Sequence, residues 1–154
     1  TEVDTLSLHD ALPISLELIK PMHGYFNPLH KGHIDYFKSA KEKADCLIVI
    51  LNNDYQRALK RSKEFMLEDE RAIILRELRV VDEVFISVDT DKTVCKSIEK
   101  VHSIFSKKFK LFFGNGGDQN NKTSPEVPVC NRLGIELIDG LGRKIQSSSW
   151  LLKN

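Results

Sequence analysis

The sequence predicts an α/β fold: a single domain built on a doubly wound, Rossmann-like, parallel five-stranded sheet. Short runs of β-branched or aromatic residues alternate with segments in which apolar residues recur at helical spacing, which is typical of repeated β-α units. The chain has 154 residues, of which 41% are hydrophobic, enough for one core. It contains no internal repeat and no Pro/Ser-rich linker that would indicate a second domain.

Four strands are predicted from uninterrupted apolar runs, as buried parallel strands require. They are Cys46–Leu51, Val84–Val88, Phe109–Phe113 and Ile135–Ile138. A further strand, the first along the chain, is expected within Leu16–Met22, although Pro21 cannot donate a hydrogen bond to a central ladder.

Residues 1–15 are interpreted as a non-core lead, because they show neither alternation nor a helical stripe. Part of this lead, Ser7–Ile14, resembles translated sequencing-adapter DNA, which favours an assembly artefact for that part. The predicted domain is therefore residues 16–154.

Three helices between the strands are predicted from apolar residues at helical spacing. The three sets begin at Ile34, Leu67 and Val94. Ser124 as N-cap, Pro125 at the first helical position and Gly134 as a C-terminal stop predict a fourth helix, and Ser147 would cap a fifth. Right-handed crossovers in such a sheet place a ligand crevice at the carboxyl ends of the strands.

Composition excludes several classes of protein. With 23 basic and 22 acidic residues the net charge is +1, which disfavours a general binder of nucleic acid or anionic membranes. The longest apolar run is Cys46–Leu51, far short of the roughly 18 to 20 residues that a membrane span needs. Three separated cysteines without a C-x-x-C pair argue against a disulfide framework and a cysteine metal site, and favour the cytoplasm.

The segment Gly24–His33 lies between the first predicted strand and the first predicted helix, where α/β folds bind phosphates. It matches neither G-x-G-x-x-G nor the P-loop pattern. Gly24 would allow close backbone approach, Asn27–Pro28 would form a turn, and Gly32 would keep the helix start open to an anion. His30 and His33 would place two imidazole donors beside that helix N-terminus, suited to charge that develops on phosphate oxygens.

This segment resembles the G-x-F-[D/N]-x-x-H-x-G-H signature of the nucleotidyltransferase superfamily, in its cytidylyltransferase-like branch. The resemblance implies catalytic roles for His30, His33 and Lys60. It implies nucleotide contacts from the loop residues Gly24, Tyr25, Phe26, Asn27 and Gly32. Two alternatives for the histidines stay open: a structural pair near a helix cap, and a zinc pair, for which no Cys, Asp or Glu is obviously placed.

Asn52-Asn-Asp54, followed by Lys60 and Arg71, resembles the N-x-D…K…R pattern of glycerol-3-phosphate cytidylyltransferases and sugar-phosphate adenylyltransferases. The resemblance implies that Asp54 and Arg71 bind the acceptor and that Lys60 contacts phosphate. Lys38–Lys63 holds seven basic and three acidic residues, a local positive excess. The alternatives are a solvated helix face for the lysines and a surface pair with a neighbouring Glu for Arg71.

Two motifs in the last third of the chain extend the resemblance. Gly114–Asp118 resembles the G-G-D loop of the family, so that Gly116, Gly117 and Asp118 would line the acceptor side, unless this is an ordinary turn. Lys144–Ser149 resembles the motif that begins the last helix and grips phosphates through hydroxyls, here those of Ser147, Ser148 and Ser149. Gly142 stands where the family has arginine, so either Arg143 or Lys144 would substitute.

Together, these resemblances imply a nucleotidyltransferase that transfers CMP or AMP from a nucleoside triphosphate to a small phosphorylated acceptor and releases pyrophosphate. CTP is the favoured donor, Mg²⁺ would be bound through the nucleotide phosphates, and a homodimer is expected. The alternatives are an adenylyltransferase acting on a sugar phosphate and a non-catalytic, nucleotide-binding regulatory domain.

Overall fold

A computed structural model of the chain describes residues 17–114 and 124–138. The strands are β1 Glu17–Gly24, β2 Cys46–Leu51, β3 Glu83–Ile86, β4 Phe109–Gly114 and β5 Glu136–Ile138. The helices are α2 Lys31–Glu42, α3 Asp54–Leu59, α4 Glu68–Arg76, α5 Cys95–Phe105 and α6 Val127–Leu133. The predicted lead, the G-G-D loop and the serine motif with its helix lie outside the described residues.

The strands lie in the order β3-β2-β1-β4-β5, and every neighbouring pair is parallel. The predicted α/β class with parallel strands is therefore confirmed. The chain builds outward from β1 through β2 to β3, and then returns to the other side of β1 for β4 and β5. In such a sheet the ligand crevice is expected outside the carboxyl ends of β1 and β4, where the direction of winding reverses.

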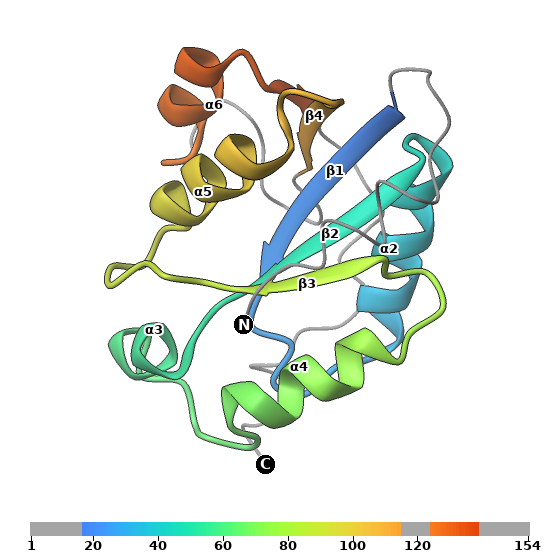
Figure 1. Ribbon diagram of the computed structural model, residues 1–154. Coiled ribbons are helices and arrows are strands. Elements are labelled where there is room, and N and C mark those ends of the chain that lie inside the picture. The colour runs from blue at the N-terminus through green and yellow to red at the C-terminus, as the bar shows by residue number, and fades with distance from the viewer. Residues whose placement is uncertain (1–16, 115–123, 139–154) are drawn as a thin grey trace.

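Helices cover both faces of the sheet, as Figure 1 shows with α2 and α4 on one side and α5 and α6 on the other. Alternate residues of β2 point to the two faces. Leu47, Val49 and Leu51 pack in one buried cluster with residues of α2 and α4. Cys46, Ile48 and Ile50 pack in a second cluster with residues of α5 and α6. β2 is fully buried along its length, which explains its unbroken apolar run.

The structure differs from the predicted elements in three places. β1 is the central strand although it contains Pro21, and its pairing with β4 is confined to residues 17–19, before the proline. α3 has no predicted counterpart. α6 begins at Val127, because Ser124 forms the preceding turn instead: its hydroxyl accepts the Glu126 N–H at 3.4 Å and donates to the Glu126 carboxylate at 2.5 Å.

The C-terminal stop of α6 is confirmed. Gly134 has φ 72°, in the left-handed region that favours glycine, and its N–H donates to the helix carbonyls of Asn131 and Cys130. β5 then follows directly and pairs with the end of β4.

Candidate active site

The candidate site is formed where β1 ends and α2 begins. β1 ends at Gly24, and the following loop leads to His30, the N-cap residue of α2. The Tyr36 hydroxyl of α2 donates to the Gly114 carbonyl at the end of β4 with an O–O distance of 3.0 Å. This bond holds α2 beside the ends of β1 and β4, where the sheet topology places the crevice.

The two histidines form a capping box at the start of α2. His30 Nδ1 accepts the Gly32 N–H at 3.1 Å, and His33 Nδ1 accepts the His30 N–H at 3.1 Å. A neutral imidazole that accepts at Nδ1 carries its proton on Nε2. Both Nε2 atoms are therefore hydrogen-bond donors, and that of His30 is buried with no partner among the described residues.

Electrostatics keep both imidazoles neutral at neutral pH. The rings are stacked, with centroids 3.8 Å apart and planes at 19°. Burial, with a smaller contribution from the neighbouring His30, lowers the pKa of His33 to about 3, and burial alone lowers the pKa of His30. The pair thus presents neutral N–H groups. A structural role at the helix cap, the alternative considered for the two histidines, explains the bonds of their Nδ1 atoms. It leaves the Nε2 protons available to a ligand.

Phe26 fixes the position of His33. Its ring is buried and meets the His33 imidazole edge-on, with centroids 4.8 Å apart, and it also contacts Phe37 at 5.3 Å. A Cβ at Gly24 would lie 2.7 Å from Cζ of Phe26. The group that approaches the Gly24 backbone closely is therefore the Phe26 ring of the protein itself. Phe26 supports the site by packing against the His33 imidazole.

Asn27 has its side-chain amide engaged within the chain. It is 1% exposed; Nδ2 donates to the Lys63 carbonyl and Oδ1 accepts the Met66 N–H, both at 2.9 Å. This side chain holds the segment between α3 and α4 against the loop, and the nucleotide contact expected of Asn27 stays a prediction. The predicted turn at Asn27–Pro28 is present and contains a cis peptide bond.

Tyr25 connects Lys60 to the same loop. The Lys60 ammonium lies over the Tyr25 ring, 4.7 Å from its centroid. Lys60 follows the last residue of α3 and is exposed to solvent. A positive charge is thus placed beside the first residue after β1, and the phosphate contact of Lys60 stays a prediction.

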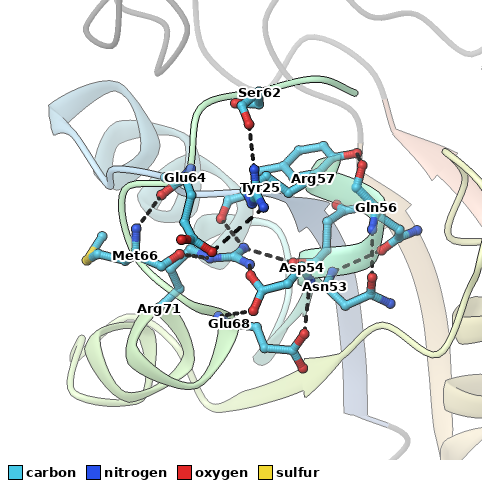
Figure 2. A network of polar contacts seen from close by, with 12 residues as sticks. Tyr25, Asn53, Asp54, Gln56, Arg57, Ser62, Glu64, Met66, Glu68 and Arg71 are labelled. Carbon is cyan, nitrogen blue, oxygen red and sulfur yellow. Dashed lines mark hydrogen bonds and ion pairs between the residues drawn. The ribbon is translucent and has the colours of Figure 1, made fainter. Parts of the chain in front are cut away.

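Arg71 is the buried centre of a polar network that includes the partly exposed Asp54, as Figure 2 shows. The Arg71 side chain is fully buried; it donates to the carbonyls of Tyr25 and Asn52 at 2.8 Å, to that of Met66 at 3.1 Å, and to Asp54 Oδ1 at 2.7 Å. These bonds join the ends of β1 and β2 to α4. Arg71 therefore has a structural role and its burial rules out the surface pair, while the acceptor contact expected of it stays a prediction.

Asp54 is likewise engaged with the protein. Its Oδ1 receives Arg71, its Oδ2 accepts the Glu68 N–H at 3.0 Å, and its own N–H donates to Glu68 Oε1 at 2.9 Å. The carboxylate thus joins the start of α3 to the start of α4. Asp54 therefore helps to hold the two helices together, and the acceptor contact expected of it stays a prediction.

The structure brings most of the predicted residues it describes to one edge of the sheet. His30, His33, Gly32 and Lys60 surround the start of α2 and the end of β1. Gly116, Gly117, Asp118, Arg143, Lys144 and Ser147–Ser149 lie outside the described residues, so their roles stay predictions.

Sequence reasoning gave Asn52 no role, although it stands in the N-x-D pattern. It directly follows β2, is 1% exposed, and its Oδ1 has no hydrogen-bond partner within the described segments.

Across residues 17–114 and 124–138, no three His, Cys, Asp or Glu side chains gather as metal ligands would. None of the helices described there has the length and apolarity that a bilayer crossing requires.

Known proteins resemble this chain in both sequence and fold. FAD synthase of Picrophilus torridus is 38% identical over 114 residues, which cover 73% of this chain and 74% of that protein. FAD synthase of Thermococcus kodakarensis is 45% identical over 64 residues, or 41% of this chain and 43% of that protein. Glycerol-3-phosphate cytidylyltransferase of Bacillus subtilis is 37% identical over 62 residues, or 40% of this chain and 48% of that protein.

The match to the Thermococcus relative thus spans less than half of that protein's length. A solved structure, the lipopolysaccharide core biosynthesis protein of Thermoplasma volcanium, superposes with a TM-score of 0.62 at 24% identity, covering 82% of this chain and 98% of its own, which shows a shared fold. The family model described as Cytidylyltransferase-like matches residues 22–122. The chain therefore belongs to the cytidylyltransferase-like family of the nucleotidyltransferase superfamily.

Proposed function

We propose that this protein is a nucleotidyltransferase that transfers CMP or AMP from CTP or ATP to a small phosphorylated acceptor and releases pyrophosphate. The observation that carries the proposal is the histidine pair at the start of α2. Its Nδ1 atoms are committed to the helix cap, so two neutral Nε2–H groups remain as donors at the crevice. Family membership supports the reaction class.

In this reaction a phosphate oxygen of the acceptor attacks the α-phosphorus of the triphosphate. The bond from that phosphorus to the bridging oxygen breaks, and the electron pair leaves with pyrophosphate. His30 and His33 would donate hydrogen bonds to oxygens on which charge grows, next to the partial positive charge of the α2 N-terminus. The acceptor is already a nucleophile, so the protein needs to position and neutralise, without a covalent intermediate.

Positive groups would complete the phosphate site. Lys60 is held over the Tyr25 ring at the end of β1 and would attract the acceptor phosphate. Ser147, Ser148 and Ser149, with Arg143 or Lys144, are proposed to hold the β- and γ-phosphates, as their resemblance to the family motif implies.

We propose Mg²⁺ as the cofactor, carried on the phosphates of the nucleotide. The site fits this arrangement, because its imidazoles present N–H groups, which cannot ligate a cation, whereas a triphosphate supplies the oxygen ligands that Mg²⁺ prefers. The bound ion would offset negative charge on the leaving pyrophosphate. The expected homodimer stays a prediction.

The donor nucleotide divides the proposal into two branches. CTP is the donor we favour, in keeping with the family match and the glycerol-3-phosphate cytidylyltransferase relatives. The FAD synthase relatives favour ATP, because the nucleotide half of FAD is AMP.

The test is a screen of pyrophosphate release. CTP and ATP are each combined with glycerol 3-phosphate, FMN and an aldose 1-phosphate, with Mg²⁺, and His30→Asn protein as the matched control. We expect release with at least one pair and a loss of about 10²-fold or more in the variant. Tight triphosphate binding by calorimetry without release from any pair would instead support the regulatory domain.

A further inference from the structure

Arg57 lies in α3 and reaches over the turn of residues 60–63 that follows this helix. Its side chain is 16% exposed, and Nη1 donates to the Ser62 carbonyl at 2.6 Å, as Figure 2 shows. The main chain joins the same two residues, because the Arg57 carbonyl accepts the Ser62 N–H at 3.3 Å. Arg57 therefore holds both main-chain polar groups of Ser62.

The turn has a backbone conformation that needs such support. Arg61 has φ 58°, in the left-handed region, which residues with a side chain rarely adopt and which persists where the surrounding contacts impose it. The two carbonyls that follow are both bonded by side chains. That of Ser62 is held by Arg57, and Asn27 Nδ2 donates to the next one, that of Lys63, at 2.9 Å. The turn is thus fastened to α3 and to the histidine loop.

The turn also carries positive charge. Its exposed cations are Lys60, Arg61 and Lys63. The Lys60 ammonium lies 4.7 Å from the centroid of the Tyr25 ring, directly after β1. The Lys60 N–H donates to an α3 carbonyl at 3.0 Å, and the bonds of Ser62 fix the chain two residues further on. The main chain on both sides of Lys60 therefore limits where its ammonium can lie.

The ion pair with Glu64 does not account for an arginine at this position. The Glu64 carboxylate lies 3.7 Å from Arg57 Nη2 and its side chain is 55% exposed, so the pair contributes little in water. Nε of Arg57 is buried and has no partner within residues 17–114 and 124–138. An apolar side chain would avoid the cost of burying this group, but it has no donor for the Ser62 carbonyl. The close contact of Arg57 is the one that shapes the turn.

We propose that Arg57 is a positioning residue for the transfer reaction. By fastening the turn of residues 60–63, its guanidinium keeps the Lys60 ammonium beside Tyr25, where an anionic group of the acceptor binds. Arg57 makes no contact with substrate and acts through Lys60. This rests on the proposed function, to which it adds a residue that lies outside the histidine motif and the N-x-D…K…R pattern.

The first experiment reads the order of the turn directly. Trypsin cleaves after lysine and arginine, so the turn contains three sites, and cleavage there requires the turn to open. Fragments are followed by mass spectrometry, with cleavage after Lys43, exposed at the end of α2, as the internal reference. We expect Arg57→Gln to speed cleavage within the turn by about 10-fold. Arg76→Gln, at an exposed position on α4, should leave it unchanged.

The second experiment measures the effect on the acceptor. Pyrophosphate release is followed with the most active pair among CTP or ATP and glycerol 3-phosphate, FMN or an aldose 1-phosphate. Arg57→Gln and Lys60→Met should each raise the KM of the acceptor by about 10-fold and change kcat by less than about 3-fold. Because Arg57 acts through Lys60, the double variant should lie within about twofold of the single ones, whereas independent effects would multiply to about 100-fold.

The outcomes separate the fastening of the turn from its role in the reaction. Cleavage at the wild-type rate in folded Arg57→Gln protein overturns the fastening, and an unchanged KM overturns the positioning role. Multiplied effects in the double variant, or a normal KM in Lys60→Met, overturn action through Lys60.

Two further results stay decisive. If no pair releases pyrophosphate, the proposed catalysis fails, and calorimetry with glycerol 3-phosphate and FMN tests Arg57 instead. Binding about 10-fold weaker in Arg57→Gln supports positioning, whereas equal binding, or none to either protein, overturns it. If Arg57→Gln protein does not fold, Arg57→Lys, which keeps the charge but has a shorter reach, replaces it in every measurement and should change each in the same direction.

Discussion

His30 offers a substitution that separates the helix cap from the chemistry. Its Nδ1 accepts the Gly32 N–H at 3.1 Å, and its Nε2 is the buried donor without a partner among the described residues. Asparagine is a favoured N-cap residue, and its Oδ1 lies where Nδ1 lies in histidine, but it has no atom at the position of Nε2. His30→Asn thus keeps the cap and removes the donor, whereas His30→Ala removes both.

The two functions of His30 have different magnitudes. Loss of an N-cap costs about 0.5 to 2 kcal/mol of stability, so we expect His30→Ala to unfold about 1 kcal/mol more easily and His30→Asn within about 0.5 kcal/mol of wild type. Loss of a donor to developing negative charge costs about 10² to 10³ in kcat. Both variants should therefore lose turnover to a similar extent, with nucleotide affinity reduced much less.

The assay is urea unfolding measured beside pyrophosphate release for the wild type and both variants. Normal turnover per folded molecule in His30→Asn would falsify the catalytic role and leave His30 as a helix cap. A loss of turnover in His30→Ala alone would show that geometry of the helix start, and not Nε2, carries the effect.

Four further predictions concern the site and the N-terminal lead. Below about pH 6.5 the unfolded chain binds a proton at His33 that the folded protein, in which the His33 pKa is about 3, does not bind. The free energy of unfolding should therefore fall by up to about 1.4 kcal/mol per pH unit as the pH drops from 6.5 toward 3. A series of urea unfolding curves in which His33→Gln protein shows the same slope would contradict this. Arg71→Leu should cost about 3 to 5 kcal/mol in urea unfolding, because it leaves the carbonyls of Tyr25, Asn52 and Met66 and the Asp54 carboxylate without their donor; a loss below 1 kcal/mol would refute the network's importance. Gly24→Ala should cost about 1 to 3 kcal/mol, since its Cβ would lie 2.7 Å from the Phe26 ring, and the combination with Phe26→Leu should recover part of the loss; no recovery would place the strain elsewhere. Deletion of residues 1–15 should leave the melting temperature unchanged by calorimetry, because no pattern ties them to the sheet, and a drop of more than about 5 °C would show that they are structural.

The strand predictions succeed best where a strand is buried between helices on both faces of the sheet. β2 is buried on both faces, so all six of its residues are apolar and its ends are visible in the sequence. α5 is similar, since Ile98, Val101 and Phe105 pack against the sheet at helical spacing.

α3 shows why other parts could not be predicted from apolar patterns. It has six residues, and its apolar side chains, Tyr55 and Leu59, are exposed, so it presents no buried stripe. Its signal is polar: Asn53 accepts the Gln56 N–H at 2.8 Å, and Gln56 accepts the Asn53 N–H at 3.0 Å. Asn followed three residues later by Gln is thus the pattern that could have identified this helix.

Arg71 illustrates a second limit, since charge alone does not tell whether an arginine faces solvent or the interior. Its bonds go to the carbonyls of Tyr25, Asn52 and Met66, which are main-chain groups and leave no trace in the residue types. The tertiary contacts that bury it come from three separate segments of the chain. Only the folded structure shows that these main-chain carbonyls receive the guanidinium.

The histidine motif, in contrast, could be identified from the sequence by its resemblance to the family signature, and the structure shows that its spacing serves two purposes. The three-residue separation of His30 and His33 is that of a capping box, in which the N-cap side chain accepts a first-turn N–H, here that of Gly32, and the His33 side chain accepts the N-cap N–H. Using Nδ1 for those bonds places the protons on Nε2, and burial keeps the rings neutral. The cap therefore fixes the tautomer that the proposed chemistry needs, and a substitution that preserves the cap is the one that can test the chemistry alone.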